Sequence, residues 1–173
     1  MRIIPATEEH LDEIVAITDQ AKASMAAAGF DQWQRGYPNR EVWEADIAEG
    51  MAYVAVDENG VAGMFRYADE PESAYDTLEG EWLTDGPYAT VHRCAVAADR
   101  RGQGIIGELF AFACRKATED GMVSVRVDTH HDNAPMRRAL AKFGFTPCGD
   151  ITLLEGVEAG NKRIAHEKVL QRS

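Results

Sequence analysis

Apolar and polar residues along the first 67 positions follow two different periods, which predict a strand, two helices and a hairpin. Leucine, isoleucine and valine recur at helical spacing over residues 11–17, and Gly29 is expected to end this helix. Asn39 is a candidate N-cap for a second helix that stops at Gly50. An Asn-Gly pair between two apolar runs favours the tight turn of a β-hairpin. The predicted strands of this part are residues 2–6, 51–56 and 61–67.

The rest of the chain alternates strand and helix patterns. Residues 104–119 carry an apolar stripe at helical spacing, and residues 133–143 are a second predicted helix. The order is therefore strand, two helices, three strands, helix, strand, helix and two strands. This order predicts an α+β or mixed α/β fold in which helices cover one sheet. The predicted strands of this part are residues 88–97, 122–127, 145–154 and 163–170.

Length and composition restrict the class of protein. A chain of 173 residues without a repeat or low-complexity linker is expected to form a single domain, 1–173. Its net charge of −11 argues against nucleic acid as a partner. It contains no apolar run long enough for a membrane span and no signal-peptide core, and its three cysteines form no CxxC pair. We therefore expect a cytoplasmic protein without a metal site, a disulfide framework or a membrane partner, and the sequence leaves a homodimer open.

Much of the negative charge lies between Asp69 and Asp85, a stretch with seven acidic residues. One interpretation is a solvated acidic loop. The other is an electrostatic field that attracts a cationic amine. Acidity alone does not decide between them.

The segment from Val91 to Gly107 joins a strand, a basic glycine-rich turn and the start of a helix. Glycines let backbone N–H groups approach a ligand closely. The first turn of a helix leaves its N–H groups unpaired at the positive end of the helix dipole. Together with Arg100 and Arg101, these parts predict a cradle for a pyrophosphate.

A competing interpretation is a dinucleotide-binding turn, because Gly102, Gly104 and Gly107 spell GxGxxG and Asp128 ends the next strand. In that fold, however, the glycine turn follows its strand almost at once, whereas residues 97–101 intervene here. Too few residues follow Gly107 for the rest of such a domain. A purely structural glycine turn is the third alternative.

The glycine turn also resembles the pyrophosphate motif of the GNAT superfamily of N-acetyltransferases, [Q/R]xxGx[G/A]. Arg101 and Gly104 match its first four positions, whereas Ile106 departs from the last one and Gly107 follows one residue late. The next strand and helix of the superfamily commonly contain NxxAxxxYxxxGF. Here Asn133 and Gly144-Phe145 match that pattern, and Met136 and Leu140 replace its alanine and tyrosine. Other segments are similar to one bacterial branch of the superfamily, namely residues 31–33, 82–88 and 128–130.

This resemblance implies the GNAT fold, a mixed and mostly antiparallel sheet of about seven strands, flanked by about four helices, with a splayed parallel pair. It implies acetyl-CoA as the acyl donor and an amine-bearing small molecule or peptide as the acceptor, without a metal. Asn133, at the start of a helix, is expected either to reach the pantetheine or simply to cap the helix. The implied cofactor-binding residues are Cys94, Ala95, Val96, Arg101, Gly102, Gln103, Gly104, Ile105, Ile106, Gly107 and Asn133.

Amine attack on a thioester needs a base, because the ammonium ion must first lose a proton. His92 is the first candidate, since several GNAT families carry a base at this place on the glycine-loop strand, and His130 is the second. Leu140 cannot supply the acid that the family's tyrosine often provides. A degenerate GNAT protein that binds acyl-CoA as a sensor or scaffold is therefore the alternative. Direct transfer is favoured over a Cys94 acyl-enzyme because nothing in the sequence marks this thiol as activated.

Four aromatic residues could line the acceptor site, although packing in the core or in loops would explain them equally well. These residues are Trp33, Tyr37, Trp82 and Tyr88.

Overall fold

The computed structural model describes residues 1–171 and separates into two compact units. Unit 1 contains residues 1–67 and 92–112, and unit 2 contains residues 68–91 and those from 113 onward. The α-helices are α1 (Leu11–Ala28), α2 (Arg40–Ala48), α3 (Ile105–Glu119) and α4 (Ala134–Lys142). The strands are β1 (Arg2–Pro5), β2 (Ala52–Asp57), β3 (Gly60–Ala68), β4 (Glu79–Gly80), β5 (Tyr88–Val96), β6 (Ser124–Thr129), β7 (Thr146–Thr152) and β8 (Lys162–Val169). Short 3₁₀ helices are η1 (Glu8–His10), η2 (Ser73–Thr77) and η3 (Ala98–Arg100).

Within residues 1–171 the strands form one eight-stranded sheet in the order β1-β2-β3-β5-β6-β8-β7-β4. The predicted mixed, mostly antiparallel sheet with four flanking helices is confirmed, including the parallel pair β5–β6. The parallel register runs from Tyr88↔Ser124 to Thr90↔Arg126. The sequence pattern missed β4, because a strand of two residues has no measurable periodicity. Strand β5 and helix α3 each begin in one unit and end in the other.

Local chemistry explains the element boundaries of unit 1. Gly29 has φ of +81° and ends α1, since only glycine adopts this left-handed conformation without strain. The Asn39 side chain accepts a hydrogen bond from the Val42 N–H at 3.0 Å and caps α2. The predicted hairpin is formed by β2 and β3, which pair antiparallel around the expected Asn-Gly turn. All three predictions are therefore confirmed.

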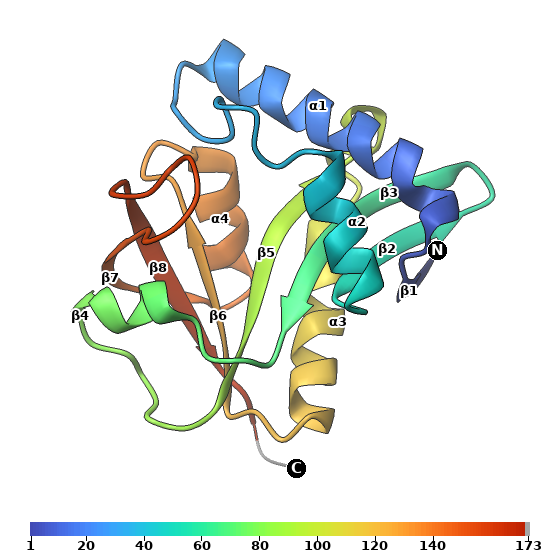
Figure 1. Ribbon diagram of the computed structural model, residues 1–173. Helices are drawn as coiled ribbons and strands as arrows, with labels where there is room; N and C mark the ends of the chain where they lie inside the picture. The colour runs from blue at the N-terminus through green and yellow to red at the C-terminus, as the bar shows by residue number, and fades with distance from the viewer. Residues whose placement is uncertain (172–173) are drawn as a thin grey trace. The chain divides into compact units, whose positions relative to one another are not determined.

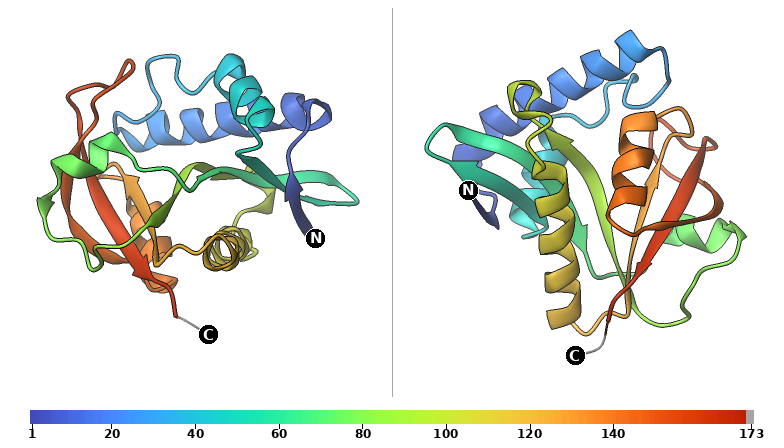
Figure 2. Two further views of the ribbon diagram at one scale, coloured as in Figure 1. Left: turned by 60° about the horizontal axis from the view of Figure 1, so that its bottom comes forward. Right: turned by 180° about the vertical axis from the view of Figure 1, so that it is seen from behind.

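The hairpin of unit 1 is covered on both faces (Figures 1 and 2). On one face Val54 and Met64 pack into a core with the apolar side chains of α1 and with Trp43 of α2. On the other face the Tyr53 and Phe65 rings stack, and Phe112 of α3 lies 5.3 Å from Tyr53 between ring centroids. Because both faces are buried, the strands of this hairpin are apolar throughout rather than alternating.

In unit 2 the alternation of side chains across β6 and β8 separates two faces. One face carries Arg126 and Glu167, which are paired in the register, and adjoins a small core of Tyr75, Ile151 and Ala165. The other face carries Val127 and His166 and is covered by α4. Asn133 caps α4 by accepting a hydrogen bond from the Met136 N–H at 3.2 Å. The β7–β8 pairing adds the outer edge of this unit, to which β4 is joined.

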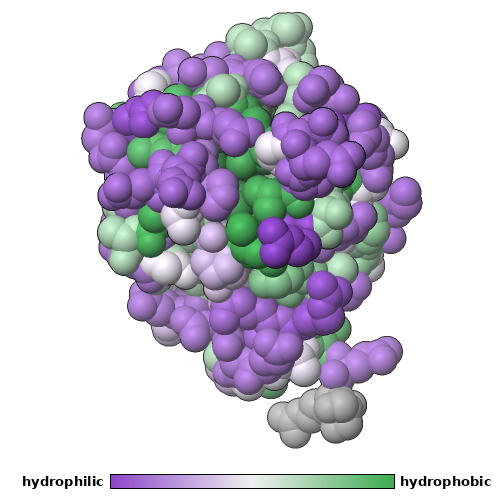
Figure 3. All heavy atoms as spheres, turned by 90° about the vertical axis from the view of Figure 1, so that its right-hand side faces the viewer, coloured by the Kyte–Doolittle hydropathy of each residue, from purple (hydrophilic) through white to green (hydrophobic). Residues whose placement is uncertain are grey.

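The surface agrees with a strongly charged composition. Hydrophilic side chains cover most of the face drawn in Figure 3. The acidic residues between Asp69 and Asp85 are exposed, except for Glu72, which is partly buried. Among residues 1–171, no helix is both long enough and apolar enough to cross a membrane. The single-domain organisation over residues 1–173 stays a prediction.

Candidate functional site

The glycine loop has the backbone geometry that a cradle for an anion requires. Gly102 and Gly104 have φ values of +78° and +80°, a left-handed conformation that side-chain-bearing residues rarely adopt. A Cβ built on either glycine meets no atom within 4 Å, so the space above the loop is open. Helix α3 starts at Ile105, directly after the loop, and its first N–H groups therefore have no intrahelical acceptor. The arrangement can bind phosphate oxygens through backbone donors.

The two arginines of the loop have different roles. Arg100 forms an ion pair with Asp57 at the end of β2, and its Nε lies 3.3 Å from Gln103 Oε1. The hydrogen bond from Arg100 lowers the pKa of the Asp57 carboxyl. Arg101 is exposed, and its Nη1 is 3.0 Å from Ser24 Oγ. Arg100 therefore anchors the loop to the hairpin, whereas Arg101 presents its charge at the surface.

Strand β5 is interrupted in its middle by Arg93, which has φ of +52°. Both terminal nitrogens and Nε of Arg93 are held: Asp46 accepts bonds of 2.7–2.9 Å, and the Tyr37 hydroxyl lies 2.5 Å from Nη1. Asp46 is 4% exposed and also forms an ion pair with Arg66 at 3.3 Å. A strained backbone that needs several partners to hold it is typical of functional segments.

The backbone after Arg93 has one edge on β3 and one edge turned away from it. The Ala97 N–H donates to the Ala62 carbonyl at 2.9 Å. Since N–H and C=O groups alternate sides along a strand, the Val96 N–H points to the opposite edge. The parallel register with β6 covers Tyr88 to Thr90 and does not include Cys94 to Val96. This edge can pair with an extended ligand as an added strand would.

Comparison with known proteins decides the family. The model of the GNAT acetyltransferase family matches residues 18–145, which include the glycine loop and α4. The chain belongs to the GNAT family. It is 32% identical to a GNAT-family acetyltransferase from Streptococcus agalactiae 2603, whose structure matches with a TM-score of 0.85 over 99% of this chain and 96% of that one.

Two more distant structures share the GNAT fold. A GNAT-family acetyltransferase from Listeria monocytogenes 4b F2365 is 19% identical, with a TM-score of 0.72 over 98% of this chain and 94% of that one. A PaiA N-acetyltransferase from Thermoplasma acidophilum, in complex with coenzyme A, is 13% identical, with a TM-score of 0.70 over 97% and 98% of the two chains. No curated protein matched this chain.

Two positions of the GNAT motif lie in or at the end of α4, Leu140, which departs from the family pattern, and Asn133, which matches it. Leu140 is fully buried in unit 2, so the position of the family's tyrosine is filled by a core side chain without an ionisable proton. Asn133 is 7% exposed and caps α4, which accounts for it structurally. Its contact with pantetheine stays a prediction.

The two candidate bases lie on different parts of the chain. His92 lies partly buried on β5, next to Arg93. His130 Nδ1 accepts a hydrogen bond from the Asp132 N–H at 3.0 Å in the turn before α4. In the neutral ring this leaves the proton on Nε2, which is then a donor and not a base. The choice of His92 as the base stays a prediction.

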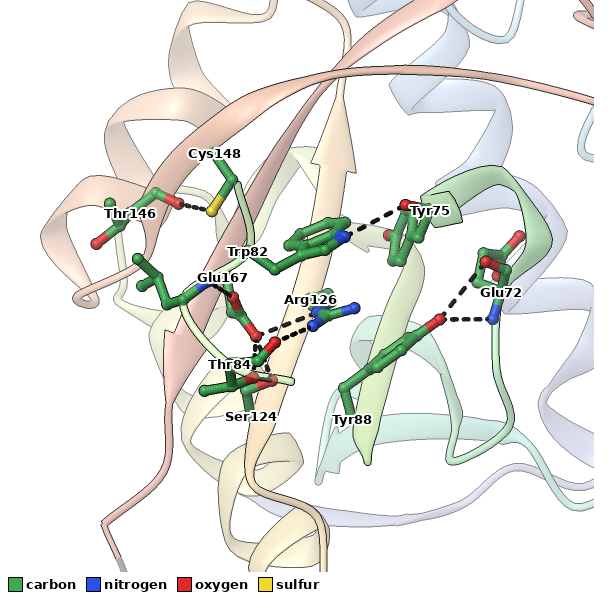
Figure 4. Close-up of polar contacts among 11 residues, drawn as sticks. Glu72, Tyr75, Trp82, Thr84, Tyr88, Ser124, Arg126, Thr146, Cys148 and Glu167 are labelled. Carbon is green, nitrogen blue, oxygen red and sulfur yellow. Dashed lines mark hydrogen bonds and ion pairs between the residues drawn. The ribbon is translucent and has the colours of Figure 1, made fainter. Parts of the chain in front are cut away.

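The predicted acceptor aromatics divide into two groups. Trp33 is 7% exposed in the core of unit 1, and Tyr37 binds Arg93, so both have packing roles. Trp82 and Tyr88 lie on either side of Arg126, with each ring centroid 4.0 Å from the guanidinium carbon (Figure 4). Arg126 thus covers one face of each ring, and a substrate contact by any of the four stays a prediction.

Sequence reasoning missed one polar pair in unit 2. Tyr75 in η2 is 1% exposed, and its hydroxyl donates to Asp128 Oδ1 at 2.8 Å. Burial and the Asp128 carboxylate raise the pKa of Tyr75 well above its ordinary value, so the phenol keeps its proton. Asp128 is partly exposed near the carboxyl end of β6, which belongs to the parallel pair. The resemblance of residues 128–130 to a bacterial branch was the available signal, but the partner, 53 positions earlier, was not visible.

Proposed function

We propose that this protein is an N-acetyltransferase that transfers the acetyl group of acetyl-CoA directly to a primary amine. The observation that carries this proposal is the open, left-handed glycine loop at the start of α3, in a chain that belongs to the GNAT family. The amides from Gly102 to Gly107 would hold the pyrophosphate, with Arg101 adding positive charge. The backbone from Cys94 to Val96 would pair with the pantetheine.

Direct transfer is supported by the protonation state of Cys94, the cysteine on the backbone segment that would pair with the pantetheine. Burial raises the pKa of Cys94 to about 12, so near neutral pH this side chain is a thiol and a poor nucleophile. In the proposed reaction His92 takes a proton from the ammonium ion, and the amine nitrogen attacks the thioester carbonyl. The new C–N bond replaces the C–S bond, and the thiolate leaves. The nitrogen loses its second proton to solvent as the amide forms, and solvent protonates the thiolate, since Leu140 has no ionisable proton.

The cradle predicts a specific loss of CoA affinity. Replacing Gly104 by valine would place a branched side chain in the open space where the phosphate is expected. We expect CoA affinity to fall by about 10-fold or more, since a lost hydrogen bond to a charged group costs about 1.5–3 kcal/mol. Isothermal titration with CoA measures this. Arg101→Ala should weaken binding more mildly.

Gly121→Val is the matched control, because Gly121 has φ of +79° and a Cβ built on it would meet no atom within 4 Å. Both valine variants therefore carry a similar backbone strain, whereas only Gly104 lies in the loop before α3. If both variants bind CoA equally well, the pyrophosphate is held elsewhere and the assignment of the cradle is wrong.

We also propose that Asp128 binds the ammonium group of the acceptor, with Tyr75 positioning its carboxylate. The partial exposure of Asp128 and its place near the carboxyl end of a parallel strand support this role, because such strand ends are where ligands bind in open sheets. The exposed acidic stretch of the same unit would attract a cationic amine.

Asp128→Asn should raise the KM for a cationic amine by about 10-fold or more, because it removes a charged acceptor and keeps the shape. CoA affinity should be unchanged, and Tyr75→Phe should give a smaller increase in KM. Asp69→Asn, at an exposed acid of the acidic stretch, is the control for general electrostatics. Steady-state kinetics that show equal effects for Asp128→Asn and Asp69→Asn would contradict a direct contact.

A further inference from the structure

A pocket of about 580 Å³ lies in unit 2 between α4 and the strands β7 and β8. In the sheet order these strands lie beyond β6, on the side away from β5. The pocket belongs to one unit, and none of its residues is part of the cradle described above. Its lining residues are His131, Asp132, Ala134, Arg137, Arg138, Ala141, Phe145, Pro147 and His166.

Arginines outnumber carboxylates in the lining of this pocket, and a further carboxylate, Asp150, contacts the lining residue His131 at 2.7 Å. Two arginines and a single aspartate line it, in a chain whose net charge is −11. Arg137 and Arg138 are consecutive and exposed on α4, and Nη1 of Arg137 is 3.0 Å from the His131 carbonyl oxygen. A guanidinium group presents several donors in one plane and matches the oxygens of a carboxylate or a phosphate. An anion would therefore contact two positively charged side chains here, although the net charge of the protein is negative and repels anions.

The pocket wall contains a buried polar group that the fold leaves unsatisfied. His166 is 3% exposed, and its Nδ1 has no hydrogen-bond partner among residues 1–171. Burial lowers the pKa of His166 and outweighs a hydrogen bond to the Ile164 backbone, which raises it, so the ring is neutral near neutral pH. A neutral imidazole has one N–H to donate and one nitrogen that accepts. An unsatisfied buried polar atom costs stability, which a bound ligand or a water bridge could recover.

Apart from His131, the remaining lining is apolar. Ala134, Ala141, Phe145 and Pro147 provide alkyl and aromatic surface next to the two arginines. Small-molecule sites commonly combine such walls with a few convergent polar groups. The occupant that fits both parts is a molecule with an oxyanion at one end and an apolar body at the other.

We propose that this pocket is a binding site for a small organic oxyanion, a carboxylate or a phosphate ester with an apolar body. Arg138 and Arg137 bind the oxyanion, and the apolar walls contact the body. His166 contributes a polar contact at the buried end. The site shares no residue with the proposed acetyl-CoA cradle and does not depend on the proposed transferase activity.

The test measures the melting temperature of the full chain with benzoate, phenyl phosphate or neutral benzamide, each with and without saturating CoA. We expect benzoate or phenyl phosphate, but not benzamide, to raise the melting temperature, as a ligand of the native state does. The two anions distinguish a carboxylate site from a phosphate site. The effect should persist with CoA present.

Arg138→Gln should reduce the affinity for the anion by about 10-fold, the loss of one charged contact. Arg115→Gln, which removes an exposed arginine from α3, is the matched control and should leave the affinity for the anion unchanged. His166→Phe should weaken the binding of the anion. The melting temperature of the free protein should stay equal or rise, because the substitution removes an unsatisfied polar atom. Three results would overturn the proposal: no anion-specific stabilisation, loss of it on CoA saturation, or equal losses in Arg138→Gln and Arg115→Gln.

Discussion

Replacing Glu167 by alanine is expected to destabilise the protein by about 3–5 kcal/mol, the cost of breaking a buried ion pair. Glu167 is fully buried and lies 3.1 Å from Arg126 Nε. It also accepts bonds from the hydroxyls of Ser124 and Thr84, both at 2.6 Å, and from the Leu83 N–H (Figure 4). Its loss leaves several buried donors and the Arg126 charge without their acceptor. Urea unfolding measures the change.

Glu79→Ala is the control, because Glu79 forms an exposed ion pair with Lys162 at 2.7 Å. Exposed pairs contribute about 0–1 kcal/mol. If the two variants lose similar free energy of unfolding, the Arg126–Glu167 cluster does not hold unit 2 together.

The same carboxylate predicts the direction of acid sensitivity. Burial raises the pKa of Glu167, but the hydrogen bonds from Ser124, Thr84 and Leu83 and the charge of Arg126 outweigh it and leave the pKa lowered. The stabilisation is therefore complete above the unfolded-state pKa of about 4.3 and is lost as the pH falls through the lower pKa of the folded state. Glu167→Gln should flatten this part of the profile of stability against pH.

His92→Ala is expected to lower kcat by at least about 100-fold, the low end for general acid–base catalysis. CoA affinity should be unchanged, because the cradle consists of other residues. The profile of kcat/KM against pH should lose the ascending limb that reports a base. His130→Ala should have a milder effect, since its Nδ1 already accepts the Asp132 N–H.

If His130→Ala loses most of its activity and His92→Ala remains active, the base was assigned to the wrong imidazole. Full activity of both variants would contradict a histidine base altogether. It would fit a carboxylate, such as Glu81 or Asp85, or an amine that is already neutral when it binds.

The elements of this fold were predictable because their signals are local. The glycine after α1, the asparagine before α2 and the Asn-Gly turn of the hairpin each specify a conformation within a few residues. The glycine loop was predictable for the same reason, since its conformation and the start of α3 depend on adjacent residues.

The polar contacts between distant residues were not predictable. Arg93 gives no sequence sign of a left-handed backbone, because its partner Asp46 lies 47 positions away. Arg126 likewise lies between Trp82 and Tyr88 only because β6 passes next to the preceding loop. Local patterns specify backbone conformation, whereas such pairs depend on the packing of the whole unit.

The most direct test of the proposed function is the release of CoA from acetyl-CoA by the purified protein with a panel of primary amines, amino acids and peptides. We expect release that depends on one class of amine, together with the acetylated amine in the mass spectrum of the products. Binding of CoA without release on any amine would contradict the proposed transfer and would identify a GNAT-fold protein that binds acyl-CoA as a sensor or scaffold.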